Sequence, residues 1–222
     1  VPFLSKATGY SLADIATEVI LGKSLKEQGI FDIYPEEKKR WYVKVPVFSC
    51  NKLRGLDAYL SPEMKSTGEA IGYDDKLNRA LYKALQAAGM RLQNYGTVFA
   101  TIARGDKAEA EPLIRRFYNL GFNIEATEGT AAYLKERGIR THVLKKIGED
   151  NSDEIVEAMR QGHIAYVLNT RDIGSAGQAS DGYLIRRYAT ENNVTIFTAL
   201  DTVKVLLDVL EETTLCISTI DA

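Results

Sequence analysis

From residue 98 onward, short apolar runs alternate with longer stretches whose apolar residues recur at helical spacing. Short apolar runs bounded by turn residues are typical of buried strands, and the longer stretches are typical of amphipathic helices. Strands are predicted over residues 98–103, 123–126, 141–144, 165–169 and 195–197. Because strands that alternate with helices across short turns form parallel sheets covered on both faces, this part of the chain is predicted to be an α/β domain.

Single residues add detail to the predicted helices. Asn151 and Glu154 are spaced as a cap pair at the start of a helix over 151–161. Pro112 falls within the helix expected over 107–120, so that helix is expected to begin late. The remaining predictions are a helix over 202–212, with an apolar stripe of Val203, Leu206, Leu207 and Leu210, and an edge strand over 215–218.

The part of the chain before this pattern has fewer regular elements. Ser11 can cap a helix that ends before Gly22, and Pro46 argues that a strand over 42–48 lies at an edge. A loop over 51–72 and a helix over 75–88 complete the predictions here. Since these elements are too few for an independent fold and the pattern changes between 89 and 96, two domains are predicted. They cover residues 1–92 and 93–222.

The composition limits the kinds of partner. A chain of 222 residues with 45% hydrophobic content can bury a sizeable core. Its formal net charge of −2 gives no general attraction to nucleic acid or to acidic membranes, so any anion site must be local. The sequence contains no signal peptide and no apolar run long enough for a membrane span. A cytoplasmic protein that binds neither nucleic acid nor membrane is therefore expected.

Cysteine and histidine are scarce. Cys50 and Cys216 are far apart and lack metal-ligand spacing, which suits free thiols in a reducing cytosol. His142 and His163 are the only histidines, and both are expected to be structural or solvent-facing. No metal site and no catalytic residue is predicted. The chain begins at Val1 without a methionine, which indicates a piece of a longer protein.

Polar side chains follow four of the predicted strands. In an open parallel sheet, ligands bind outside the carboxyl ends of the strands, and helix N-termini there offer unpaired N–H groups to anions. A ribose phosphate would need hydroxyls, lysines and an amide at this edge. Taken singly, each residue also fits an ordinary turn or a solvated surface charge. The set comprises Thr101 and Lys107, Thr127 and Thr130, Lys145 and Lys146, and Asn169 and Arg171.

The motifs of the chain also carry a family resemblance. Residues 1–9 (VPFLSKATG), 22–25 (GKSL) and above all 61–69 (SPEMKSTGE) resemble the tail of the second ATP-grasp unit in the large subunit of carbamoyl-phosphate synthase. From about Gln93 the chain is similar to the regulatory domain that follows that unit. The resemblance implies a methylglyoxal-synthase-like parallel β-sheet flanked by helices, preceded by an incomplete α+β ATP-grasp tail.

In that family, nucleotide effectors such as UMP or IMP bind at the sheet edge described above. The resemblance implies that the effector phosphate is bound by Thr101, Lys107, Thr127, Thr130 and Lys146. It assigns the base and ribose to Asn169, Arg171 and Thr198. The segment 172–182 differs in length from the family pattern, and no site residue is assigned in it.

Two further positions bear on which effector is expected. Members that respond to ornithine bind it with a Glu and a Tyr, which align here with Val45 and Ile196. Because valine cannot pair with an amino group, control by UMP in a pyrimidine-dedicated enzyme is expected. Phosphoribosyl pyrophosphate is the expected activator. The alternative of an enzyme shared between arginine and pyrimidine biosynthesis stays open.

The resemblance extends to the parent enzyme. It implies ATP-dependent synthesis of carbamoyl phosphate from bicarbonate and glutamine-derived ammonia, with Mg²⁺ or Mn²⁺, upstream domains and a glutaminase small subunit as partners. This piece is expected to bind effector without catalysis and without a cofactor of its own. Two alternatives remain: a homo-oligomerisation module with a vestigial site, and a methylglyoxal-synthase-type lyase. The lyase is less favoured because its Gly-Pro-x-Gly-Gly-Asp motif is missing.

Overall fold

The computed structural model describes residues 1–32, 39–48, 58, 64–147, 153–171 and 179–215. The chain divides into two compact units. The first unit comprises Val1–Pro46 and Glu69–Ala88, and the second unit comprises Val47–Gly68 and Gly89–Ala222. The assignment of residues 1–92 and 93–222 to two protein families stays a prediction.

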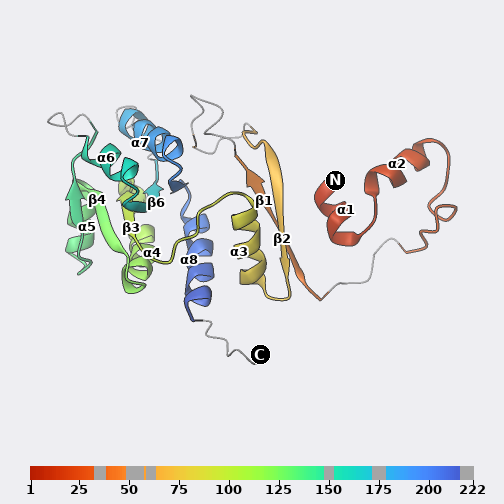
Figure 1. The fold of residues 1–222 in the computed structure, drawn as a ribbon, viewed down its shortest axis with the longest axis horizontal. Coiled ribbons are helices and arrows are strands. Elements are labelled where there is room, and N and C mark those ends of the chain that lie inside the picture. The colour runs from red at the N-terminus through yellow and green to blue at the C-terminus, as the bar shows by residue number, and fades with distance from the viewer. Residues whose placement is uncertain (33–38, 49–57, 59–63, 148–152, 172–178, 216–222) are drawn as a thin grey trace. The chain divides into compact units, whose positions relative to one another are not determined.

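A five-stranded parallel sheet forms the centre of the second unit (Figure 1). Its strands are β3 (Thr97–Thr101), β4 (Asn123–Thr127), β5 (His142–Leu144), β6 (Ile164–Asn169) and β7 (Thr195–Phe197). Their order across the sheet is β5-β4-β3-β6-β7. Every strand predicted between residues 98 and 197 is present with small shifts at its ends, so the predicted α/β fold with a parallel sheet is confirmed.

Helices cover both faces of this sheet. They are α4 (Lys107–Asn119), α5 (Glu128–Lys135), α6 (Glu154–Arg160), α7 (Ala179–Glu191) and α8 (Leu200–Leu215), with a 3-10 turn η1 (Arg104–Asp106) before α4. Because successive side chains of a strand point to opposite faces, Val98 and Ala100 pack with α4, α5 and α8, whereas Phe99 packs with α6 and α7.

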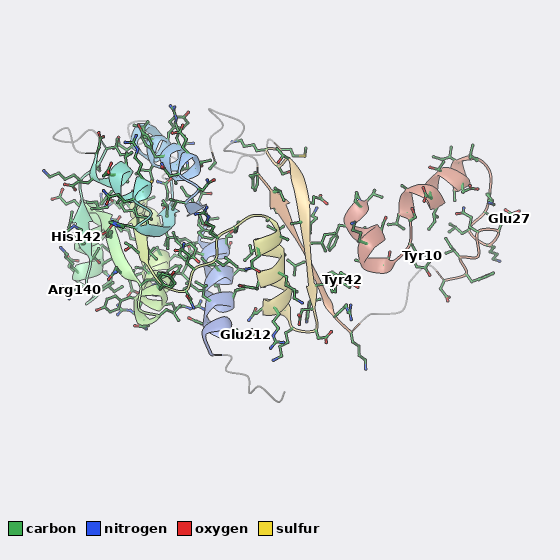
Figure 2. All side chains as sticks on the ribbon, in the orientation of Figure 1. Tyr10, Glu27, Tyr42, Arg140, His142 and Glu212 are labelled. Carbon is green, nitrogen blue, oxygen red and sulfur yellow. The ribbon has the colours of Figure 1, made fainter. Side chains whose placement is uncertain are left out.

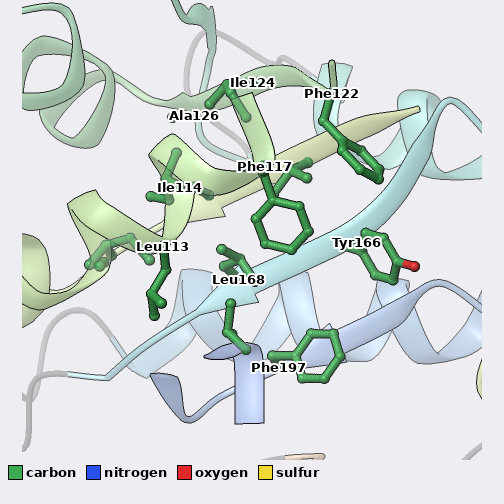
Figure 3. Close-up of a cluster of buried hydrophobic side chains, with 14 of the residues drawn as sticks. Leu113, Ile114, Phe117, Phe122, Ile124, Ala126, Tyr166, Leu168 and Phe197 are labelled. Carbon is green, nitrogen blue, oxygen red and sulfur yellow. The ribbon is translucent and has the colours of Figure 1, made fainter. Parts of the chain in front are cut away.

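Aromatic residues fill the core on the α4 and α8 side (Figure 3). The Phe117 ring meets the Phe122 ring edge-on at a centroid distance of 5.3 Å and lies 5.8 Å from the Tyr166 ring. The Tyr166 hydroxyl accepts a hydrogen bond from the backbone N–H of Gln93 and donates one to the backbone carbonyl oxygen of Gln93, both at 2.7 Å. Burial raises the pKa of Tyr166 to about 12. This side chain thus ties the segment before β3 to the sheet.

The late start predicted for the Pro112 helix is wrong. Helix α4 begins at Lys107 and contains Pro112 in its interior. Proline lacks the N–H that would bond to the Ala108 carbonyl, at a cost of about 3 kcal/mol. Burial of the inward face outweighs this cost, since tertiary packing overrides local propensity. The buried residues of that face are Ala110, Leu113, Ile114 and Phe117.

Other element boundaries also need correction. Glu154 is the first residue of α6, whose cap position is Asp153, and Asn151 lies outside the described residues. The predicted loop over 51–72 is wrong at its end, because β2 begins at Gly68. Helix α8 reaches Leu215, and residues 216–218 of the predicted edge strand lie outside the described residues, as do Cys50 and Cys216.

The described part of the first unit contains three helices and a small sheet. Its elements are α1 (Pro2–Thr8), α2 (Leu12–Ile20), β1 (Trp41–Val47), β2 (Gly68–Asp74) and α3 (Leu77–Ala87), with β1 and β2 paired. Helix α2 and strand β1 were predicted from the sequence. Pro46 predicted an edge position for its strand, and both strands of this two-stranded sheet are edge strands. Gly72 lets α3 approach β2 closely: an added Cβ would lie 2.1 Å from the Ala80 carbonyl oxygen.

Gly72→Ala is expected to destabilise the packing of α3 on β2 by about 3 kcal/mol, the upper end of overpacking penalties. The new methyl group would also lie 2.8 Å from the Ala84 Cβ, and backbone atoms cannot move aside as a flexible side chain can. Hydrogen exchange of the α3 amides measures the effect. Gly68→Ala is the matched control, because its Cβ would meet only the Val47 Cβ at 3.8 Å. Equal exchange rates in the two variants would contradict the expectation.

No helix in the described part of the chain has both the length and the apolar character needed to cross a membrane.

Candidate functional site

The strand order creates a crevice at one edge of the sheet. From β3 the chain moves outward through β4 and β5, and it then returns to place β6 on the other side of β3. In open parallel sheets, ligands bind outside the carboxyl ends of the strands at the point where the strand order reverses. Thr101 and Asn169 are paired at the ends of β3 and β6. The candidate ligand-binding site is therefore next to these two residues.

A cavity of about 420 Å³ lies at this position. Seven of the eight residues predicted to bind an effector line it: Thr101, Lys107, Thr127, Thr130, Lys146, Asn169 and Arg171. Thr198 is not among the described residues that line it. The structure therefore brings together residues from four strand ends, and their role in ligand binding stays a prediction.

The N-terminus of α5 forms one wall. Thr127 occupies the cap position in an extended conformation, and its side chain makes no capping hydrogen bond to the helix. The first N–H groups of a helix lack intrahelical partners and carry a partial positive charge. Thr130, which is 3% exposed, accepts a hydrogen bond from the Ile102 amide at 3.2 Å, so its own O–H remains a donor. These N–H and O–H groups can donate hydrogen bonds to an anion that is bound in the cavity.

Lys107 links the starts of α4 and α5. Its Nζ donates a hydrogen bond to the Gly129 carbonyl oxygen and lies 5.8 Å from the centre of the Tyr133 ring. Burial lowers the pKa of Lys107, and the neighbouring Arg104 lowers it further. A lysine held in this way presents its charge at a fixed point beside the α5 N-terminus.

The described lining of the cavity has more cationic than anionic side chains, although the chain as a whole does not. Among its described lining residues, five are cationic (Arg104, Lys107, Lys146, Arg171 and Arg186) and one, Asp181, carries a carboxylate. The whole chain has a formal net charge of −2. Such local charge favours an anionic ligand. Among the described residues, no group of three or more His, Cys, Asp or Glu is arranged to hold a metal ion.

Several lining residues were not predicted from the sequence. Arg104 lies between Thr101 and Lys107 in the sequence, so the segment that joins these two predicted residues could have indicated it. Thr170 accepts a hydrogen bond from the Ala103 amide at 2.8 Å and joins the segments after β3 and β6. Arg186 is 3% exposed and donates to the Asn169 side chain, whereas its neighbour Arg187 is exposed. Nothing in the sequence distinguishes these two arginines. The other lining residues that were not predicted include Asp181 and Gly182.

A second hollow of about 500 Å³ lies at the opposite ends of β3 and β4. Arg140 and His142, labelled in Figure 2, contribute to its lining together with Thr97 and Glu125. Both histidines are exposed, and His163 lines neither hollow. Among the described residues, Glu125 Oε2 is buried without a hydrogen-bond partner. Burial raises the pKa of Glu125, although His142 and His163 act in the opposite direction.

Glu125→Gln is expected to stabilise the protein at pH 7 and to have little effect below pH 4. A raised carboxyl pKa means that the folded state binds the proton more tightly. The wild-type stability therefore falls as the pH rises from the ordinary glutamate value of about 4.3 to the raised value. The neutral amide avoids this cost. Thermal unfolding between pH 4 and 8 measures the difference, with the exposed Glu136→Gln as the control. A less stable Glu125→Gln variant at pH 7 would contradict this account.

Comparison with known families agrees with this topology. A family model described as the MGS-like domain matches residues 109–198. The match begins within α4 and ends just after β7, so it includes most of the parallel sheet and the cavity residues from Thr127 to Arg171. Thr101 and Lys107 precede the matched segment. The chain therefore contains an MGS-like domain in its second unit.

Proposed function

We propose that this chain is the C-terminal part of a carbamoyl-phosphate synthase large subunit, and that its MGS-like domain binds a phosphorylated nucleotide effector of the UMP type. The observation that carries the proposal is the cationic cavity at the switch point of the sheet, built around the N-terminus of α5. The match to an MGS-like domain supports it, because the resemblance to carbamoyl-phosphate synthase predicts that fold.

The residues suggest how such an effector is bound. The phosphate lies against the first turn of α5, where Thr127 and Thr130 supply hydroxyls and Lys107 supplies charge. Lys146 approaches from the end of β5. Asn169 and Arg171 extend the cavity from the end of β6 toward the ribose and base. The assignment of Thr198 to the same group depends on the resemblance alone.

The proposal places this chain within a larger cytoplasmic enzyme. Upstream domains with ATP and Mg²⁺ or Mn²⁺ carry out the synthesis of carbamoyl phosphate, and a glutaminase subunit supplies ammonia. The present chain binds the effector and has no catalytic role. If the parent forms oligomers, this chain also takes part in self-association. Effector binding alters synthesis only if the effector favours one state of the parent enzyme, as any allosteric coupling requires. A lyase is less favoured, because neither histidine is among the residues that line the cavity.

Calorimetric titration with UMP tests the proposal. Saturable binding is expected, with loss of binding to uridine because the phosphate supplies most of the interaction. Lys146→Met should weaken UMP binding, whereas Lys145→Met should not, since Lys145 is the adjacent lysine and is not among the described lining residues. The two variants change the net charge equally. A folded protein that binds neither UMP nor other nucleoside monophosphates would contradict the proposal and favour the assembly module.

A further inference from the structure

Arg186 is a buried cation beneath the cavity. It projects from α7, is 3% exposed and lines the cavity together with Asn169, which is 2% exposed. Its Nη1 donates a hydrogen bond to Asn169 Oδ1 at 2.8 Å. Burying a guanidinium is costly unless hydrogen bonds and opposite charges compensate it.

This contact fixes the orientation of the Asn169 amide. Arginine has five N–H donors and no acceptor, so only the oxygen of the amide can face it. The two ends of an asparagine amide are otherwise hard to distinguish. Because the oxygen is directed to Arg186, the Asn169 nitrogen is the end that can serve a ligand. Asn169 therefore offers hydrogen-bond donors to the cavity.

Gly182 provides the space for this arrangement. It lies in the first part of α7, and a Cβ added there would be 3.1 Å from Arg186 Nη1 and 3.6 Å from Asn169 Nδ2. A contact of 3.1 Å is tight, and the guanidinium would have to move by a few tenths of an ångström. A methyl group at this position would thus press on Arg186 and meet the Asn169 amide at an ordinary van der Waals distance.

We infer that Arg186 is a positioning residue of the effector site: it holds the Asn169 amide with its nitrogen toward the ligand. The site then selects phosphorylated ligands that place a hydrogen-bond acceptor, such as a base carbonyl oxygen, at Asn169 Nδ2. This inference depends on the proposed function, since it concerns the same cavity. It adds Arg186 to the residues that determine specificity.

Binding of UMP and of inorganic phosphate to the whole chain tests the inference. Asn169→Asp retains an oxygen for Arg186 and removes the N–H donor. Its thermal stability should not fall, while its UMP affinity should decrease at least tenfold more than its phosphate affinity. The added negative charge acts on both ligands, so the ratio of the two affinities reports the lost donor. An unchanged ratio would overturn the inference.

Arg186→Lys provides the second variant, with Arg187→Lys as its control. Lysine retains the charge but not the planar fork of arginine. Phosphate affinity should stay within twofold, and UMP affinity should fall several-fold. Equal changes for both ligands, or no change in either, would show that Arg186 does not orient the amide. If Arg186→Lys fails to fold, Asn169→Asp decides the question. Failure of the wild-type chain to bind UMP would instead contradict the proposed function.

Discussion

Phe117→Ala is expected to lower the free energy of unfolding of the second unit by about 3–5 kcal/mol. Phe117 is fully buried in α4 and contacts the rings of Phe122 and Tyr166. Its removal would leave a cavity between α4 and the sheet, and the edge-on contact with Phe122 would be lost. Urea unfolding followed by circular dichroism measures the change.

Tyr118→Ala is the matched control, because Tyr118 is the next residue of the same helix and is 39% exposed. Its replacement should cost about 1 kcal/mol or less, in the range of changes away from the core. If both variants lost the same stability, the core described around Phe117 would be wrong.

Lys107→Met is expected to weaken UMP binding by about 10- to 100-fold, the range for loss of a hydrogen bond to a charged group. The ammonium group lies beside the N-terminus of α5, where the phosphate is proposed to bind. Methionine preserves the length and the apolar contacts of the side chain, so the folded structure should be retained. Isothermal titration calorimetry gives the dissociation constants.

Lys204→Met is the control for net charge, since Lys204 is an exposed residue of α8 outside the described lining of the cavity. UMP binding to the wild type should weaken as the salt concentration rises. Binding to Lys107→Met should depend less on salt. Equal UMP affinity in Lys107→Met and the wild type would show that the phosphate lies elsewhere.

The sheet could be predicted from the sequence because its strands are short apolar runs separated by turn residues. The edge that carries the cavity could also be predicted, since parallel strands direct their carboxyl ends to the same side. Thr101 and Asn169 are far apart in the sequence, yet their positions at strand ends were sufficient to group them.

Other features depend on contacts that the sequence does not display. Strand β2 pairs with β1 and packs against α3 through Gly72, but its glycines and charged residues resemble a loop. Arg186 lies on the buried side of α7 while Arg187 is exposed, and only the helix packing separates them. Pro112 shows the reverse case, in which a local signal was overridden by burial of the helix face.

A crystal structure of the chain with UMP at saturating concentration tests the central claim most directly. The account predicts the phosphate within hydrogen-bond distance of the first-turn amides of α5 and of Lys107 Nζ, with the base toward Asn169. A UMP molecule bound instead in the hollow formed by Arg140 and His142, or at any place away from the α5 N-terminus, would contradict it.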